Sequence, residues 1–295
     1  MITGQLLSKV HPPIHPSTPM PSPHPSSLTL NDGTTVPWLA FGTGTALYSK
    51  DVSNIVRAAL VHGFTHIDTA QVYQNERSVG EALRAAGIPR ENVYVTTKLG
   101  KIDTAKGESV ESALRESLDK LGVEYVDLFL VHAPLNHVGQ LKQVWKDVVD
   151  VKRKGLTKSI GVSNFTVKQL KEIIEDGDEV PAVNQVSIYI HICCSTIRNR
   201  HISLSTSTQI EYHPWLLTAT RSLLQFHAQH KIITASYGGL TPILPRRGAG
   251  EASLADSRAR LVTVLDKLAS ARGENVTQNQ ILLKWLQHNG ILAVT

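Results

Sequence analysis

The sequence has very few cysteines: two among 295 residues, and they are adjacent, Cys193 and Cys194. Adjacent cysteines do not have the spacing of a zinc site, and no third cysteine is present to build a disulfide framework. The sequence also has no apolar run near the roughly 20 residues that a membrane-spanning helix needs. We therefore expect no structural metal, no disulfide scaffold and no membrane partner.

Basic runs interleaved with aromatic residues are also missing, although the formal net charge is +5. Part of this charge lies outside the main body, in Lys9 and in Arg198 and Arg200. A charge so spread does not predict a nucleic-acid partner. A mildly basic body suits a small phosphorylated ligand equally well.

The first 26 residues lack the apolar stretch of a secretory signal, so a cytoplasmic location is expected. Seven of the 14 prolines lie between Pro12 and Pro25, mixed with serine and histidine. Such a stretch cannot form a helix or an interior strand and buries little apolar surface. We interpret residues 1–26 as a disordered proline-rich tail; a docking peptide is the alternative.

The remaining residues alternate between helical and strand patterns. LTLNDGTTVPWLAFGTG predicts a hairpin that turns at residues 31–33. Helical stretches then end at glycines and precede short apolar strands; the first has Ile55, Val56, Ala59 and Leu60 on one face. No GxGxxG motif follows a strand, which disfavours a Rossmann fold. The fold expected is an α/β (β/α)₈ TIM barrel with an N-terminal hairpin, ending in the strand ILAVT without a covering helix.

Four polar residues stand at or just after the ends of predicted strands: Asp68, Tyr73, Lys98 and His132. The carboxyl ends of barrel strands form the rim where barrel enzymes place their chemistry. Each residue alone has a structural explanation, such as a helix cap for Asp68. Four at successive strand ends predict an active site.

The motifs around these residues resemble the aldo-keto reductase family over about residues 28–295. GFTHIDTAQVYQNERSVGEAL and KLGVEYVDLFLVHAP are similar to its two signatures, GVSNF and IEYHP are further matches, and ASYGGLTPI is similar to fungal members. The resemblance implies an NADP-dependent oxidoreductase that reduces small aldehydes or ketones to alcohols, acting as a monomer.

The resemblance also implies the catalytic roles. Tyr73 is the general acid that protonates the carbonyl oxygen, and Lys98 lowers its pKa from the ordinary value near 10. Asp68 holds Lys98 in place. His132 orients the carbonyl and helps to stabilise the developing oxyanion.

Cofactor contacts are implied in the same way. Ser163, Asn164 and Gln185 would hold the carboxamide of the nicotinamide, and Tyr237 would stack on its ring. A helix cap is a compatible alternative for Ser163 and Asn164. Gly238 and Leu240 would lie along the pyrophosphate, faced across the bore by Gly42, Thr43 and Gly44.

Two features depart from the family pattern. The sequence stops at Thr295, where the segment that contacts the 2′-phosphate should begin, so preference for NADP over NAD rests on the resemblance alone. Residues 186–209 form an insertion within barrel residues 27–295. Its ends are compatible with intron borders, so we hypothesise a translated intron; a genuine surface loop is the alternative. Transcript sequencing decides between them, and Gln209 could replace Gln185 if the segment is retained.

Two other functions remain open. The broken strand and the missing C-terminal end favour a catalytically impaired barrel that binds cofactor weakly or acts as a regulatory subunit. A Schiff-base aldolase using Lys98 is a third possibility, but it leaves Asp68 and Tyr73 without a shared purpose.

Overall fold

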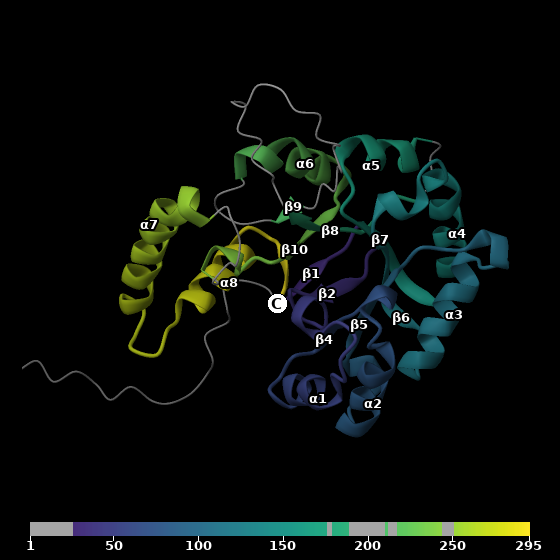
Figure 1. The fold of residues 1–295 in the computed structure, drawn as a ribbon, viewed down its shortest axis with the longest axis horizontal. Helices are drawn as coiled ribbons and strands as arrows, with labels where there is room; N and C mark the ends of the chain where they lie inside the picture. Colours follow the sequence, from purple (N-terminus) through teal and green to yellow (C-terminus); the bar gives the residue numbers. More distant parts are fainter. Residues whose placement is uncertain (1–25, 176–178, 189–209, 212–216, 244–250) are drawn as a thin grey trace, which may run out of the picture.

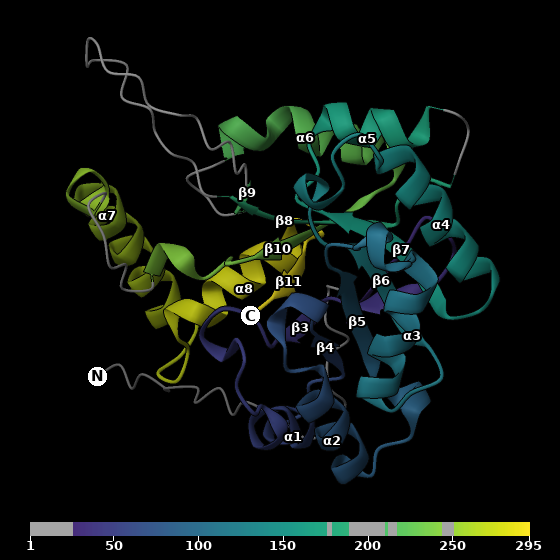
Figure 2. The ribbon, with the colours of Figure 1, turned by 45° about the vertical axis from the view of Figure 1, so that its right-hand side comes forward.

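The computed structural model of the chain describes residues 26–175, 179–188, 210–211, 217–243 and 251–295. The predicted tail, apart from Ser26, and residues 189–209 of the predicted insertion lie outside these ranges. Parallel strands form the centre of the molecule, and helices surround them (Figures 1 and 2). The barrel strands are β3 (Leu39–Gly42), β4 (His66–Asp68), β5 (Tyr94–Leu99), β6 (Val126–Val131), β7 (Thr157–Ser163), β8 (Val183–Ile188), β10 (Ile233–Tyr237) and β11 (Leu292–Val294).

The strands close into a ring because β11 pairs in parallel with both β10 and β3. Every neighbouring pair around the ring is parallel, including β8 with β10. The predicted (β/α)₈ barrel is confirmed. Its helices are α1 (Ser53–Val61), α2 (Glu76–Ala86), α3 (Val110–Leu121), α4 (Leu141–Arg153), α5 (Val167–Ile174), α6 (Leu217–His230), α7 (Glu251–Ser270) and α8 (Gln278–His288).

The hydrophobic core has an inner and an outer part, set by the two-residue alternation of each strand. In β6, Leu128 and Leu130 belong to the cluster inside the barrel, whereas Phe129 and Val131 belong to the cluster under the helices. All four side chains are buried, so this strand is covered on both sides. That explains its nearly continuous apolar sequence.

The predicted hairpin closes the amino-terminal end of the barrel. Its strands β1 (Ser27–Thr29) and β2 (Thr35–Pro37) pair antiparallel. Thr34 shares a hydrogen bond of 2.7 Å with Ser159, near the start of β7, and Asn31 donates to the carbonyl oxygen of Pro181, just before β8. The carboxyl ends of the strands are therefore left as the accessible rim.

The first helix buries a narrower stripe than its sequence suggested. Val56, Ala59 and Leu60 are buried, but Ile55 is 44% exposed. Residues three and four apart share a helical face, so Ile55, four residues before Ala59, lies on this face but at its edge. The predicted apolar face is therefore only partly buried.

Strand β8 continues three residues past Gln185, where the insertion was predicted to begin. Val186 still pairs with Ser236 of β10. Ser187 and Ile188 then pair antiparallel with the short strand β9 (Ile210–Glu211). The chain therefore leaves the barrel through a two-stranded ladder at the rim.

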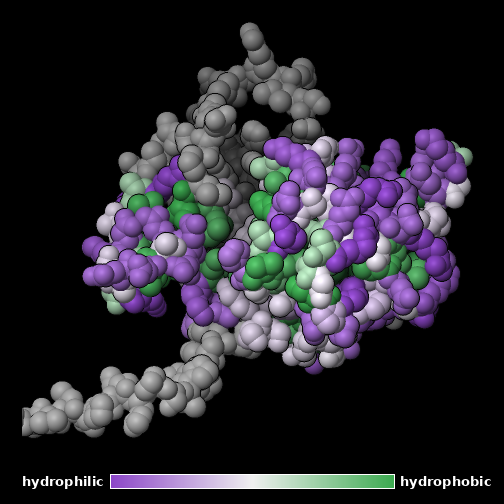
Figure 3. Space-filling model, turned by 90° about the horizontal axis from the view of Figure 1, so that it is seen from below, coloured by the Kyte–Doolittle hydropathy of each residue, from purple (hydrophilic) through white to green (hydrophobic). Residues whose placement is uncertain are grey.

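The last part of the chain contains two helices that the sequence patterns had not indicated. Helix α7 packs against α8, and α8 packs against the final strand β11. None of the described helices is long and apolar enough to cross a membrane. Seen from below, the described surface is mostly hydrophilic, with smaller apolar patches (Figure 3).

Candidate active site

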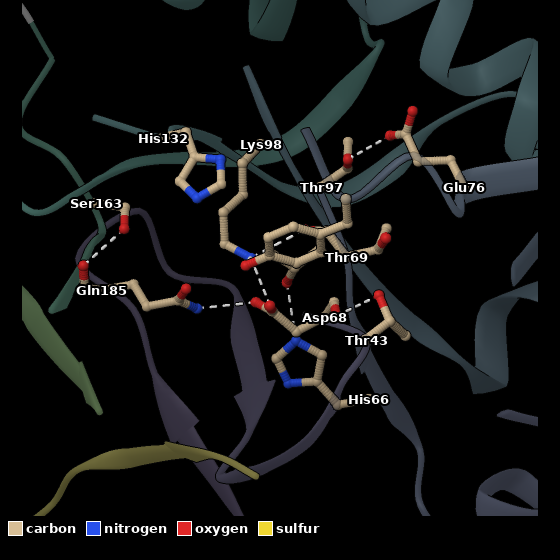
Figure 4. Close-up of polar contacts among 12 residues, drawn as sticks. Thr43, His66, Asp68, Thr69, Glu76, Thr97, Lys98, His132, Ser163 and Gln185 are labelled. Carbon is tan, nitrogen blue, oxygen red and sulfur yellow. Dashed lines mark hydrogen bonds and ion pairs between the residues drawn. The ribbon is translucent and has the colours of Figure 1, made fainter. Parts of the chain in front are cut away.

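The four predicted catalytic residues come together at the carboxyl end of the barrel. Asp68 ends β4, Tyr73 ends the 3-10 helix η2 (Gln71–Tyr73), Lys98 lies near the end of β5, and His132 directly follows β6. Lys98 and His132 lie on neighbouring elements beside Asp68 in the close-up (Figure 4). The ring centroids of Tyr73 and His132 are 5.6 Å apart, nearly edge to face.

Lys98 is the centre of this group and is completely buried. Its Nζ donates to Asp68 Oδ1 at 2.5 Å, to the carbonyl oxygen of Thr69 at 2.9 Å and to Tyr73 Oη at 3.4 Å. An ammonium has three N–H donors, so these contacts satisfy all of them. A buried ion pair is tolerated only with such complete bonding.

Tyr73 has a higher pKa than a tyrosine in water. Burial raises its pKa well above the ordinary value, and the negative charge of Asp68 and the neighbouring Tyr48 add to the effect. This direction is opposite to the one expected from Lys98 alone. The physical reason is that burial disfavours the charged phenolate, and the carboxylate of Asp68, 2.5 Å from the ammonium, raises the pKa of Tyr73 further. The phenol therefore keeps its proton at neutral pH.

His132 is neutral over the physiological range. Burial lowers its pKa to about 3, and the charge of Lys98 acts in the same direction. Its backbone is fixed on both sides, because its N–H donates to Leu99 and its carbonyl oxygen accepts from Asn164 Nδ2 at 3.1 Å. Its Nδ1 is buried without a hydrogen-bond partner among the described residues. A buried unpaired nitrogen is costly unless a ligand or water contacts it.

Three of the predicted cofactor residues lie beside the catalytic group. Ser163 Oγ and the backbone N–H of Asn164 both donate to the carbonyl oxygen of Gln185 at 2.8 Å. Asn164 has a φ of 64°, in the left-handed region, which turns the chain at the end of β7. The side chain of Gln185 donates to Asp68 Oδ2 at 2.8 Å, so Gln185 is also part of the catalytic network (Figure 4).

The predicted residues 42–44 make three different kinds of contact. The N–H of Gly42 donates to the carbonyl oxygen of Thr295, and Thr43 is fully buried with its hydroxyl bonded to Asn75. At Gly44, a Cβ atom would lie 3.0 Å from Cζ and 3.2 Å from Oη of Tyr73. Even the Cβ of an alanine here would therefore require the phenol ring to move by a few tenths of an ångström.

The last predicted group begins at Tyr237, the final residue of β10. Burial raises the pKa of Tyr237 to about 12, while a hydrogen bond with Thr45 opposes the shift; Tyr73, Lys98 and Asp68 are close enough to contribute. Gly238 has a φ of 82° and turns the chain there. Leu240 packs against the cluster of α7 and α8, so a pyrophosphate contact would fall to its backbone.

Several site residues were not predicted from the sequence. The ring of Tyr48 packs edge to face on Tyr73, with centroids 4.9 Å apart. Asn75 donates to the carbonyl oxygens of Thr43 and Leu47, tying the loop after β3 to the start of α2. The polar pair Asn75–Glu76, two residues after Tyr73 and at the start of an amphipathic helix, was the available signal. Within the described ranges, no group of histidine, cysteine and acidic residues could hold a metal ion.

Comparison with known proteins identifies the family. The aldo/keto reductase family model matches residues 38–294. An aldo-keto reductase of Mycobacterium sp. (strain MCS) is 37% identical over 88% of this chain and 76% of its own length. An NAD/NADP-dependent indole-3-acetaldehyde reductase of Schizosaccharomyces pombe is 32% identical, covering 89% of this chain and 82% of the relative. A methylglyoxal reductase, DkgA, of Salmonella typhimurium is 32% identical over 92% and 82%.

A solved structure supports the same assignment. The crystal structure of an aldo/keto reductase from Brucella melitensis superposes with a TM-score of 0.70 and 29% identity, covering 92% of this chain and 87% of that one. The family match spans most of the barrel and includes the rim residues described above. The chain therefore belongs to the aldo/keto reductase family and is an oxidoreductase.

Proposed function

We propose that this enzyme reduces aldehydes or ketones to alcohols with NAD(P)H, using Tyr73 as the proton donor. The observation that carries the proposal is the contact of one buried ammonium with both a carboxylate and a phenol: Lys98 Nζ with Asp68 and with Tyr73 Oη. The relatives named for reduction of indole-3-acetaldehyde and methylglyoxal both act on aldehydes. NAD(P)-dependent carbonyl reduction is therefore the activity of this chain.

The residues at the rim fit a nicotinamide. Ser163 and Ala235 both pair with Gln185 in the barrel, so the ends of β7 and β10 flank the end of β8. Tyr237, at the end of β10, offers a flat aromatic surface on one side of Gln185. Ser163 and Asn164 offer polar groups on the other side.

When bound, the reduced nicotinamide supplies a hydride to the carbonyl carbon. Tyr73 gives its proton to the carbonyl oxygen, which becomes the alcohol oxygen, and the phenolate later regains a proton from solvent. The raised pKa of Tyr73 ensures that the proton is present before the reaction. A positioned general acid contributes about 10²- to 10⁴-fold to the rate.

Lys98 and His132 both support this transfer. The Lys98 N–H that points at Tyr73 Oη stabilises the phenolate as it forms, because a charge-assisted hydrogen bond strengthens when its acceptor becomes negative. Neutral His132, with its pKa lowered to about 3, donates a hydrogen bond to the carbonyl oxygen and orients it. Asp68 holds the lysine in place.

NADP(H) is the proposed cofactor in preference to NAD(H). The S. pombe relative is named for both, so the comparison leaves the choice to experiment. Steady-state kinetics with each cofactor test it: the proposal expects kcat/KM with NADPH to exceed that with NADH, and equal or reversed values contradict it.

The test of the activity is the loss of NADPH absorbance with methylglyoxal or another activated aldehyde, with Tyr73→Phe as the control. Turnover that depends on aldehyde and is lost in the variant supports the proposal. NADPH binding without turnover would indicate the impaired barrel instead. Borohydride trapping of a carbonyl compound on Lys98 would indicate the aldolase.

Three further expectations remain proposals. A monomeric state is tested by size-exclusion chromatography with light scattering, and a cytoplasmic location by imaging a tagged chain. The hypothesis that 186–209 is translated intron is tested by sequencing transcripts; uniform presence of the segment in mature messenger would contradict it.

A further inference from the structure

The segment that carries Tyr73 is hydrogen-bonded to strand β5 and to Gly100, the residue directly after it, with one contact on each side of the tyrosine. At one end, Gly100 donates its backbone N–H to Gln71 Oε1 at 2.7 Å. At the other end, Thr97 Oγ1 donates to Glu76 Oε1 at 2.6 Å. Thr97 and Gly100 also stand on either side of Lys98 in the sequence. The two contacts therefore bracket both members of the Tyr73–Lys98 pair.

Helix α3 lies against both contacts. Gln71 Nε2 donates to the carbonyl oxygen of Ala113 at 2.9 Å and to Ser117 Oγ at 3.0 Å. Burial raises the pKa of Glu76, and the nearby hydroxyl groups of Thr97 and Ser117 oppose that shift. Ser117 therefore lies next to both Gln71 and Glu76. We refer to Gln71, Glu76, Thr97 and Ser117 as the outer clamp.

The outer clamp lies outside the barrel wall, whereas Lys98 points into the bore. Thr97 and Lys98 are neighbours in a strand, so their side chains leave opposite faces of the sheet. Thr97 and Ser117 are 0% exposed and Glu76 is 2% exposed. In the close-up, Glu76 lies at the edge of the view, beyond Thr97, and bonds to Thr97 rather than to Asp68 or Lys98 (Figure 4).

Burying the carboxyl group of Glu76 under helices costs desolvation free energy, so the outer clamp is not explained by a contribution to folding stability alone. A buried polar group costs free energy unless it is bonded, and a bonded one is often replaceable by an apolar group of similar shape. One oxygen of Glu76, Oε2, has no hydrogen-bond partner among the described residues. Such hydrogen bonds fix the position and orientation of the segment that carries Tyr73, because they restrict angles and distances more sharply than apolar contacts do.

The frame around the clamp is rigid. Helices α2 and α3 approach so closely that a Cβ on Gly80 would lie 2.6 Å from the carbonyl oxygens of Lys120 and Leu121. On the other side of the segment, the backbone N–H of Ser49 donates to the carbonyl oxygen of Tyr73 at 2.9 Å. A substitution in the outer clamp should therefore displace Tyr73, because the surrounding close packing leaves little room for other residues to adjust instead.

We propose that Gln71 and Glu76, through Thr97 and Ser117, are positioning residues that set the distance between Tyr73 Oη and Lys98 Nζ. This inference rests on the proposed function of Tyr73 as the proton donor. The distance is 3.4 Å, close to the outer limit of a hydrogen bond. A displacement of a few tenths of an ångström would break the contact that stabilises the phenolate.

The test compares Thr97→Val, which removes the hydroxyl at nearly constant volume, with Thr97→Ser, which restores it. Glu81→Gln is the matched control, because Glu81 lies on the same helix as Glu76 but is exposed. Gln71→Met repeats the test at the other anchor and serves if Thr97→Val does not fold. Each variant is measured for kcat with NADPH and an activated aldehyde, for the dissociation constant of NADPH, and for thermal stability.

A second readout does not depend on turnover. Tyrosine labelled with ¹³C at Cζ gives an NMR resonance for Tyr73, assigned by its loss in Tyr73→Phe. The proposal expects this resonance to shift in Thr97→Val and Gln71→Met, and to return in Thr97→Ser. The same variants should lose kcat by about 10- to 100-fold, as small misplacements of a reacting group do, with NADPH affinity and the Glu81→Gln control unchanged.

The outcomes separate the two proposals. If the wild type does not oxidise NADPH, the proposed function fails, while the NMR shift still tests the clamp. If the wild type is active and Thr97→Val keeps both its kcat and its Tyr73 resonance, the clamp does not position the tyrosine. If Thr97→Val loses kcat only in proportion to a loss of folded protein, a structural role replaces the positioning role.

Discussion

Replacing Lys98 with methionine removes the buried ammonium at nearly constant side-chain length. Three contacts of Nζ are lost, to Asp68, to Thr69 and to Tyr73. The carboxylate of Asp68 is only 2% exposed and keeps the neutral donor Gln185 Nε2. The change therefore leaves a charge inside the barrel without a counter-charge.

The cost of this change is large relative to the stability of a domain. Removing one partner of a buried ion pair destabilises by about 3–5 kcal/mol, because the other charge stays desolvated. A typical unfolding free energy is about 5–15 kcal/mol. We expect Lys98→Met to lower the free energy of unfolding by an amount near 4 kcal/mol, within that range for broken pairs.

A second variant shows whether the buried charge is the cause. In the double variant D68N/K98M the uncompensated carboxylate is gone, and its amide oxygen can still accept from Gln185. Replacing both members of a buried pair is commonly close to neutral, so the double variant should recover at least about 2 kcal/mol. Urea unfolding followed by circular dichroism measures all three proteins, provided that the unfolding is reversible.

Two results would refute this reasoning. The first is a Lys98→Met protein as stable as the wild type, which would mean that water reaches Asp68. The second is a double variant less stable than Lys98→Met, which would mean that packing rather than charge dominates at this position.

Three further predictions follow from the same structure. Gly44→Ala should lower kcat about tenfold with little loss of NADPH affinity, because its Cβ would lie 3.0 Å from the Tyr73 ring; an unchanged kcat would contradict the packing. Burial lowers the pKa of His66 and His227 to about 4 and that of His132 to about 3. In the unfolded chain each imidazole has its ordinary pKa near 6.5, so below that pH the unfolded chain binds more protons than the folded protein does. The free energy of unfolding should therefore fall as pH drops from about 6.5 to about 4, and a constant urea midpoint over that window would contradict the burial of these rings. Asn184→Ala should raise the dissociation constant of NADPH about tenfold, measured by fluorescence quenching. The side chain of Asn184 accepts from the backbone N–H of Phe165 and donates to its carbonyl oxygen, and so fixes the backbone next to the proposed cofactor residue Asn164. A loss of kcat alone would contradict this prediction.

The barrel could be predicted because its helices end at residues, such as glycine, that mark the end of a helix in the sequence. Helix α3, for example, ends at Gly122, which has a φ of 66°, and β6 follows as an apolar run. The two-sided burial of β6 explains that run, and the hairpin follows from its turn residues. In these elements the local sequence preference agrees with the final structure, so they can be predicted from the sequence.

The catalytic group could be located but its electrostatics could not. Strand ends placed Asp68, Lys98 and His132 on one rim, and Tyr73 followed from its motif. The pKa of Tyr73 depends on burial and on the distance from Lys98 to Asp68, and neither is written in the sequence. The sign of the shift was therefore wrong when it was inferred from the lysine alone.

The outer clamp was missed for a different reason. Thr97 lies one residue before Lys98 and looks like an ordinary strand threonine, and Glu76 looks like a solvent-facing residue in the first helical turn. Their contact crosses 21 residues in the sequence and depends on where helix α3 holds α2 relative to β5. Likewise, the pairing of β8 with β9 depends on a return of the chain that no local pattern predicts.

The central claim is that Tyr73 donates the proton to the carbonyl oxygen, and single-turnover hydride transfer in Tyr73→Phe tests it most directly. The enzyme is saturated with NADPH, mixed with an activated aldehyde, and followed by the loss of NADPH absorbance. We expect a fall in the transfer rate of about 10²- to 10⁴-fold, with NADPH affinity unchanged. A Tyr73→Phe protein that transfers hydride at the wild-type rate would contradict it.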